Sequence, residues 1–210
     1  MPTLRPIKAD DIDALYAISL ATGLAGDDAT HLYQDGKLMG HIYSAPYACL
    51  EPGLALVLED ENGIAGFAVG TTDTAGWESR LEREWWPALR MQYPDPAGSS
   101  CDWTADQKRW ALIHRPERTP AIVAREYPAH LHLNLLPRRQ GQGLGARLFA
   151  SWLELSCAHG VSALHVGVNR GNARALQFWA RCGFQVLSVD AAVTRTVWMG
   201  RRSRGDASSG

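Results

Sequence analysis

The sequence predicts a single α/β domain built around a mixed sheet. The chain has 210 residues, and a typical domain holds about 150. In the second half, strand-like segments alternate with helical ones, a pattern typical of parallel neighbouring strands. In the first half, two strand-like segments flank an Asn-Gly pair, a pattern typical of an antiparallel hairpin. We therefore expect one domain over residues 1–200, followed by a disordered polar tail over residues 201–210.

In the first half, patterning and turn residues predict two helical regions, a hairpin and two further helices after a short first strand. The first helix starts at Asp10 or Asp11, which are typical capping residues. The second helical region is interrupted near Gly36 and ends at Pro46. The expected strands are 4–7, 54–59 and 64–71, and the later helices are 77–91 and 104–114 with a loop over 93–100 between them.

In the second half, the alternation of elements is regular. A strand over 130–136 ends at Pro137, and a glycine-rich turn then opens a long amphipathic helix. Two final strands follow the last helix. The expected elements after the turn are a helix over 143–159, a strand over 163–168, a helix over 172–182 and strands over 184–189 and 194–199.

Composition and charge exclude several classes of partner. Lys plus Arg is 21 and Asp plus Glu is 22, so the net charge is −1. Nucleic acids and anionic membranes are bound through clustered positive charge, so we expect neither as a partner. The sequence has no run of about 18 apolar residues and no signal-like start. Its four cysteines show no CxxC pairing, which favours reduced thiols and a cytoplasmic location.

The glycine turn is the most informative segment. It reads Gln140-Gly141-Gln142-Gly143-Leu144-Gly145 and opens a helix. Glycines let backbone N–H groups approach a bulky anion, and a helix N-terminus adds unpaired N–H groups, so a pyrophosphate fits there. Countercharge would come from Arg138, Arg139 and Arg147. The turn lacks the Gly-Lys-Ser/Thr of a P-loop and the spacing of a Rossmann fingerprint. A turn that merely allows close packing of strand and helix is the alternative.

A second motif lies downstream of this turn. It reads Asn169-Arg170-Gly171-Asn172-Ala173-Arg174-Ala175-Leu176-Gln177-Phe178-Trp179, followed by Cys182-Gly183-Phe184. It resembles the N-x-x-A-x-x-F-Y…G-F signature of the GNAT superfamily of acyl-CoA N-acyltransferases, and the turn matches that family's Q/R-x-x-G-x-G/A motif. Other segments resemble bacterial relatives of the acetyltransferase-like C-terminal domain of O-GlcNAcase: Asp28-Ala29-Thr30, Leu32-Tyr33, Tyr43, Pro46-Tyr47, 70–74, Tyr93-Pro94 and His130-Leu131-His132.

The resemblance implies a GNAT fold that binds acetyl-CoA as co-substrate. In that fold a mixed central sheet, with helices on both faces, is splayed between its fourth and fifth strands, and acetyl-CoA lies in the splay. Backbone groups of Leu133 and Leu135 would pair with the pantetheine arm, and amides from Gly141 to Ala146 would hold the pyrophosphate. The implied cofactor-binding residues are Leu133, Asn134, Leu135, Arg139, Gln140, Gly141, Gln142, Gly143, Leu144, Gly145, Ala146, Asn172 and Phe178.

Catalysis needs a proton acceptor for the amine and a proton donor for the thiolate. His130 and His132 are two residues apart on a strand and so face the same side. Either could accept the amine proton, or both could be satisfied core residues. Trp179 occupies the position where the family commonly has tyrosine, and indole donates a hydrogen bond without giving up its proton. No third ligand has metal-site spacing to the histidine pair, so we expect no metal.

Residues of the first half would shape the acceptor site. Asp73 could bind a cationic amine or cap the turn that follows it, while Tyr43 and Trp77 could line a pocket or pack in the core. Two functions remain open. One is an N-acetyltransferase acting on a primary amine, either a small molecule or a peptide lysine. The other is a catalytically weak acetyl-CoA-binding module that senses the cofactor or binds a partner. The oligomeric state also remains open, a homodimer included.

Overall fold

The computed structural model describes residues 2–188 and 195–202 and contains one seven-stranded sheet. The strand order is β1-β2-β3-β4-β5-β7-β6, and β4 and β5 form the parallel pair in an otherwise antiparallel arrangement. The expected mixed sheet is therefore confirmed. The strands are β1 (Thr3–Pro6), β2 (Ala55–Asp60), β3 (Gly63–Thr71), β4 (Ala129–Leu135), β5 (Ala163–Asn169), β6 (Gln185–Val186) and β7 (Thr196–Arg202).

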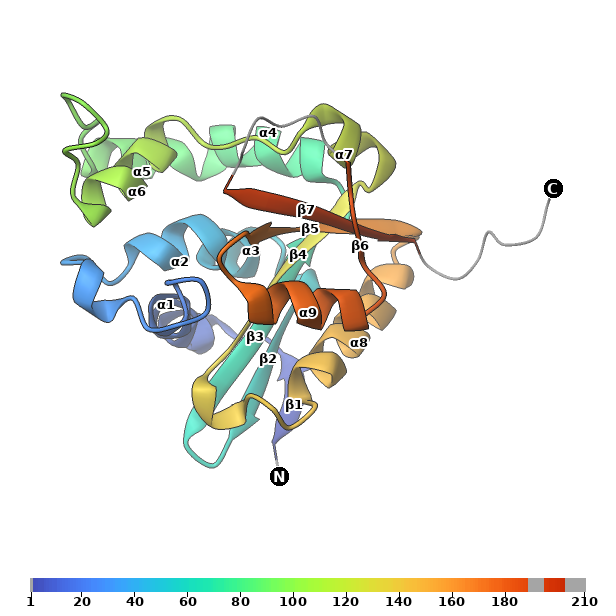
Figure 1. Ribbon diagram of the computed structural model, residues 1–210. Helices are drawn as coiled ribbons and strands as arrows, with labels where there is room; N and C mark the ends of the chain where they lie inside the picture. The colour runs from blue at the N-terminus through green and yellow to red at the C-terminus, as the bar shows by residue number, and fades with distance from the viewer. Residues whose placement is uncertain (1, 189–194, 203–210) are drawn as a thin grey trace.

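Helices cover both faces of the sheet, as expected (Figure 1). Side chains of β2 alternate between the faces: Val57 packs with α1, while Leu56 and Leu58 pack with α8. This alternation gives the domain two hydrophobic cores, one on each side of the sheet. The helices are α1 (Ile12–Ala21), α2 (Leu38–Tyr43), α3 (Ala45–Leu50), α4 (Thr74–Glu84), α5 (Trp86–Gln92), α6 (Ala105–His114), α7 (Ala121–Glu126), α8 (Leu144–Cys157) and α9 (Ala173–Arg181).

Helix α8 covers one face of the sheet with a stripe of apolar side chains. Leu144, Leu148 and Trp152 recur every four residues and are all buried against the sheet. The Trp152 indole also donates to the Leu54 carbonyl at 2.9 Å, so its polar atom is satisfied. Among the described residues, no helix has the length and apolar character needed to cross a membrane.

The sheet divides between β4 and β5. These strands pair only through Ala129 with Leu164 and His130 with His165, after which they separate. Figure 1 shows the result, with β2 and β3 running steeply and β5 and β7 lying across them. The splay between the fourth and fifth strands is therefore confirmed.

Several helix boundaries differ from the sequence-based expectations. The helix expected over 77–91 is two helices, because Pro87 in the first turn of α5 has no N–H to continue α4. Helix α4 starts early, at Thr74, because the Asp73 carboxylate accepts from the Gly76 N–H and caps it. Pro46 does not end a helix but lies in the first turn of α3, where its missing N–H costs nothing. The short α7 has no equivalent in the sequence-based expectation.

The C-terminal strands also differ. Strand β6 forms only two ladder pairs with β7, whereas β7 continues to Arg202. Residues 201 and 202, expected in the tail, therefore pair with β5, and the Arg201 guanidinium donates to the Cys182 carbonyl. Backbone pairing does not depend on side-chain polarity, so a polar composition did not mark the end of the strand. Positions 189, 194 and 203–210 of the expected strands and tail lie outside the described residues.

Candidate active site

A narrow cleft of about 150 Å³ opens where β4 and β5 separate. Its walls come from the two strands and from the start of α9. Five of the residues expected in the site line it, namely His132, Leu133, Asn134, Asn172 and Trp179. The complete lining is Leu131, His132, Leu133, Asn134, Val166, Gly167, Val168, Asn169, Asn172, Ala175 and Trp179.

The backbone of β4 is oriented as the expected pantetheine contacts require. The Leu136 N–H donates to the Ala65 carbonyl, toward β3, at 2.8 Å. Because backbone groups alternate along a strand, those of Leu133 and Leu135 point the other way, toward the splay. Of these groups, the Leu135 carbonyl already accepts a hydrogen bond from the Gln140 side-chain amide at 2.7 Å.

The glycine turn leaves its backbone amides open. Gly141 and Gly143 have φ of 73° and 74°, a conformation that favours glycine, and a Cβ atom at either position would meet nothing within 4 Å. Among the described residues, no protein acceptor receives the N–H groups of Gly141 to Ala146. The first amide of this region with a backbone acceptor is that of Arg147, which donates to the Gly143 carbonyl. The turn therefore presents six open amides at a helix N-terminus.

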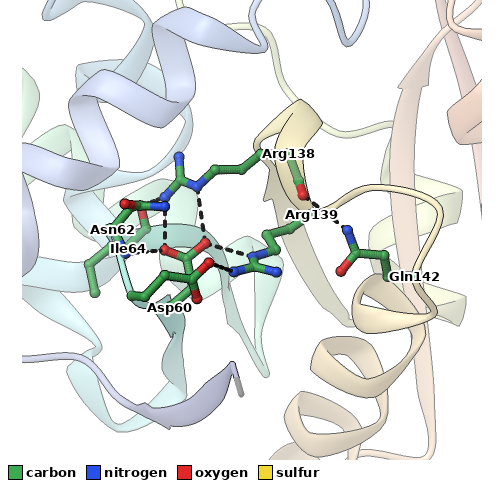
Figure 2. A network of polar contacts seen from close by, with 7 residues as sticks. Asp60, Asn62, Ile64, Arg138, Arg139 and Gln142 are labelled. Atoms are coloured by element: carbon green, nitrogen blue, oxygen red, sulfur yellow. Dashed lines mark hydrogen bonds and ion pairs between the residues drawn. The ribbon is translucent and has the colours of Figure 1, made fainter.

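A polar network holds the turn in place from below (Figure 2). The Asp60 carboxylate, whose side chain is fully buried, accepts from Arg138 at 3.0 Å and from Arg139 at 2.7 Å. These guanidinium groups hold the pKa of Asp60 well below its usual range. Gln142 donates to the Arg138 carbonyl at 3.0 Å, which fixes the far end of the turn. Arg139, expected to offset cofactor charge, is thus paired with Asp60 and also with Glu61.

The start of α9 closes the cleft near the turn. Asn172 caps this helix, because its side-chain oxygen accepts from the Ala175 N–H at 2.9 Å. The Asn172 amide nitrogen faces Gly26, where an added Cβ would lie 3.0 Å from it. Arg174, which sequence reasoning did not select, donates to Asp27 at 2.6 Å and lies 3.4 Å from the Gln140 side-chain oxygen. The loop after α1 is thereby attached to the glycine turn.

The aromatic residues of α9 face different neighbours. Phe178 packs against Gly145, where a Cβ would lie 3.3 Å from the ring, so glycine permits close contact between α8 and α9. Trp179 is 6% exposed and makes edge contacts with Phe149 at 5.4 Å and Phe184 at 5.0 Å between ring centroids. Trp179 is therefore both a core residue and part of the cleft wall.

His130 is buried, and both of its ring nitrogens are used. Thr74 lies 2.7 Å from Nδ1 and the Tyr47 hydroxyl lies 2.6 Å from Nε2. Because the Thr74 hydroxyl donates to the Pro128 carbonyl, it accepts from Nδ1–H, and Tyr47 donates to Nε2. Burial holds the pKa of His130 well below its usual value. Both ring nitrogens are thus hydrogen-bonded within the protein, an arrangement that fits the core role left open by the sequence.

His132 is placed differently, although it is on the same face of β4. Its ring lies 5.3 Å from Tyr47 and 5.8 Å from Tyr43 between centroids, and it lines the cleft. No hydrogen bond to its nitrogens occurs among the described residues. Burial and the neighbouring His165 lower the pKa of His132 to about 4. His132 is therefore a cleft residue whose lowered pKa favours the neutral ring and whose nitrogens have no hydrogen-bond partner among the described residues.

His165 on β5 completes a row of three histidines that the sequence did not indicate. Its ring lies 5.4 Å from that of His130, and its Nδ1 donates to the Tyr127 carbonyl at 2.6 Å. Burial lowers the pKa of His165 to about 4. The proximity of His165 to the other two histidines depends on the strand register, because the parallel pairing of β4 and β5 places His130 opposite His165. Within the described part of the chain, no group of three His, Cys, Asp or Glu is arranged to hold a metal ion.

The three residues expected to bind the acceptor do not form one pocket. Asp73 caps α4, the alternative role that the sequence left open. Trp77 is 2% exposed and stacks on Tyr47 at 4.4 Å, so it is a core residue. Tyr43 alone lies beside His132, and its hydroxyl accepts from Arg109 at 3.3 Å.

Comparison with known proteins agrees with this geometry. The model of the acetyltransferase (GNAT) family matches residues 27–184. The chain belongs to this family. Two GNAT signature residues, Asn172 and Trp179, line the cleft, and the glycine turn of the signature opens α8. The resemblance stated from the motifs is thus confirmed.

Individual GNAT relatives match most of the chain. Protein O-GlcNAcase of Rattus norvegicus is 24% identical over 205 residues, which cover 95% of this chain and 22% of the rat protein. The chain thus spans far less than the full length of that relative. The crystal structure of SsHAT is 36% identical, with a TM-score of 0.86, and covers 96% of this chain and 98% of its own. The yncA structure from Salmonella typhimurium, solved with its cofactor acetyl-CoA, is 15% identical, has a TM-score of 0.55 and covers 98% and 96%, so it shows the fold alone.

Proposed function

We propose that this GNAT protein transfers the acetyl group of acetyl-CoA directly to a primary amine, which is either a small molecule or a peptide lysine. The observation that carries the proposal is the row of open amides from Gly141 to Ala146 at the start of α8. Such amides, with the positive end of the helix dipole, suit a pyrophosphate. The adjacent cleft would take the pantetheine arm along the free edge of β4.

Gln140 and Gln142 support this role by bracing the glycine turn, because their side-chain nitrogens are used within the protein. Each of these nitrogens donates to a backbone carbonyl of the protein, one at Leu135 and the other at Arg138. Because Asp60 also holds the two arginines, the turn is fixed before any ligand arrives. A fixed turn loses little conformational entropy on binding, which favours affinity.

The proposed chemical step is a direct acyl transfer with one proton leaving the amine and one reaching the thiolate. The amine nitrogen would form a bond to the thioester carbonyl carbon, the C–S bond would break, and the proton lost by nitrogen would balance the one gained by the thiolate. Holding the two reactants in one cleft supplies much of the acceleration. The Leu133 N–H, on the splay side of β4, would stabilise the developing oxyanion.

His132 is our proposed proton acceptor, acting directly or through water. Its pKa of about 4 means that the ring is neutral at physiological pH and its nitrogen is free to accept. The low pKa also makes it a weak base, so the amine must arrive largely neutral. His130 is not part of this step, because Tyr47 and Thr74 occupy both its nitrogens.

The alternative is an acetyl-CoA-binding module with little turnover. Trp179 favours this alternative, because an indole N–H in the cleft wall can donate a hydrogen bond to a leaving thiolate but does not release its proton. Acetyl-CoA-dependent release of thiol across a panel of amines separates the two functions. Tight cofactor binding with no turnover on any amine would leave only the module.

The cofactor site is tested by Gly143→Glu with Gly160→Glu as matched control. Both glycines have a positive φ, of 74° and 81°, and both face open space, so the strain and the added charge are comparable. At Gly143 the carboxylate would repel the phosphates, and acetyl-CoA binding by calorimetry should be lost, whereas the control should bind normally. Equal affinity in the two variants would contradict the phosphate assignment.

Location is part of the same proposal. All four cysteines are free thiols, and three of them are exposed. Free exposed thiols persist in a reducing compartment, which supports a cytoplasmic location.

A further inference from the structure

Arg109 of α6 is a half-buried cation that forms no ion pair among the described residues, although the exposed Glu117 acts on it through space. Its Nε donates to the Tyr33 hydroxyl at 2.8 Å and its Nη1 to the Tyr43 hydroxyl at 3.3 Å. Among the described residues, no carboxylate oxygen is recorded within 4.0 Å of this guanidinium. A guanidinium carries five N–H donors, so the two tyrosines leave part of its fork unused. Desolvating a cation is costly unless it is paired, so such an arrangement favours an anionic ligand.

Tyr43 is the neighbour that this cation shares with His132 of the proposed reaction centre. The Arg109 Cζ atom is 5.9 Å from the centroid of the Tyr43 ring, and the centroid of the His132 ring is 5.8 Å from the same point. The guanidinium and the imidazole are therefore at most about 12 Å apart. A molecule with a few carbon atoms between two polar ends spans this separation.

The surrounding charges leave room for an anion. Glu117 and Arg195 are the other charged groups that act on the Tyr43 hydroxyl through space, and both are exposed. Counting the described residues alone, one carboxylate, Glu117, stands against the two guanidinium groups of Arg109 and Arg195, which leaves a positive excess around Tyr43. Asp106, the nearest acid on α6, points elsewhere, because it accepts from the backbone N–H groups of Gln34 and Asp35.

We propose that the acceptor is an amine that also carries a carboxylate or phosphate group, with the anion bound by Arg109 and the amine presented at His132. This inference rests on the proposed acetyltransferase function and specifies its substrate class. The planar fork of arginine matches two oxygens of a carboxylate or phosphate at once, and Tyr33 and Tyr43 hold it in a fixed orientation. Simple alkylamines would leave the guanidinium unpaired.

The test measures acceptor binding by calorimetry in the presence of coenzyme A, so it does not depend on turnover. The ligands are γ-aminobutyrate against butylamine, ε-aminohexanoate against hexylamine, and aminoethyl phosphate against ethanolamine. Charge-assisted hydrogen bonds should make at least one acidic amine bind about tenfold to a hundredfold more tightly than its match. A preference confined to the phosphate pair would identify phosphate as the anion. Equal binding within every pair would overturn the inference.

Variants locate the preference on Arg109. Arg109→Gln should abolish it, and Arg109→Lys, which keeps the charge without the fork, should retain only part of it. The control is Lys108→Gln, which removes a positive charge from the exposed side of the same helix and should keep the full preference. A preference unchanged in both Arg109 variants would also overturn the inference. If the parent protein does not bind coenzyme A, that result would instead contradict the proposed function.

Discussion

Acid should destabilise this protein through its row of buried and half-buried histidines, and His165 is the clearest probe. The pKa of His165 is lowered to about 4 by burial, whereas histidine in an unfolded chain has a pKa near about 6.5. Between these values the unfolded chain binds the proton and the folded chain does not. Above about pH 6.5 the titration of this ring therefore does not lower the unfolding free energy, and below that value the unfolding free energy decreases progressively as the pH falls toward 4.

The expected magnitude follows from the difference in pKa. One unit is worth about 1.4 kcal/mol, so the full effect of this ring is about 3.4 kcal/mol. Between about pH 7.5 and pH 5 the unfolded ring takes up nearly a whole proton and the folded ring little, which costs about 2 kcal/mol of unfolding free energy. His165→Gln removes this ring but retains an N–H that can donate to the Tyr127 carbonyl.

The assay is urea denaturation followed by tryptophan fluorescence at the two pH values. The loss of stability on acidification should be about 2 kcal/mol smaller in His165→Gln than in the parent. His31→Gln is the control, because this side chain is exposed and should leave the parent's pH dependence unchanged. If His165→Gln does not fold, His132→Gln is expected to give a similar reduction, since its pKa is also about 4. A pH dependence identical to that of the parent would refute the reasoning.

The remaining predictions concern the cleft. His132→Gln should lower turnover about a hundredfold, while calorimetry finds an unchanged affinity for acetyl-CoA. In the parent, the rate should follow ionisation of the acceptor amine, without an inflection near pH 6.5. A variant with parental turnover would exclude His132 as the base. Asp60→Asn should weaken acetyl-CoA binding several-fold and speed hydrogen exchange at the glycine turn, because Arg138 and Arg139 lose their common ion-pair partner. Unchanged exchange would mean that the turn keeps its conformation without the Asp60 ion pairs. Trp179→Tyr should raise turnover about tenfold at a cost of about 1 kcal/mol in unfolding free energy, and a rate equal to the parent's would show that thiolate protonation is not limiting.

The parts of the site predicted from sequence are those with local causes. Gly141 and Gly143 are required by positive φ, and Asn172 caps the helix that it precedes, so each leaves a signal within a few residues. The hairpin through Asn62-Gly63 and the amphipathic α8 follow from the same kind of short-range rule.

The parts that could not be predicted depend on contacts between distant segments. Tyr47 and His130 are 83 residues apart, and Arg109 and Tyr43 are 66 apart. Nothing near His130 in the sequence distinguishes a satisfied ring from a free one, and the decisive partners are on α3 and α4. The position of Arg109 beside Tyr43 likewise requires α2 and α6 to pack together.

The brief junction between β4 and β5 has a consequence for how the protein resists heat. Two residue pairs are the whole ladder between those strands, so a pantetheine arm lying along β4 would act as a missing rung. A ligand that binds only the folded chain adds stability that grows with its concentration, about 2.7 kcal/mol at a hundred times the dissociation constant. The melting temperature should consequently rise with each tenfold increase in coenzyme A, which makes thermal melting a sensor of whether this seam is occupied.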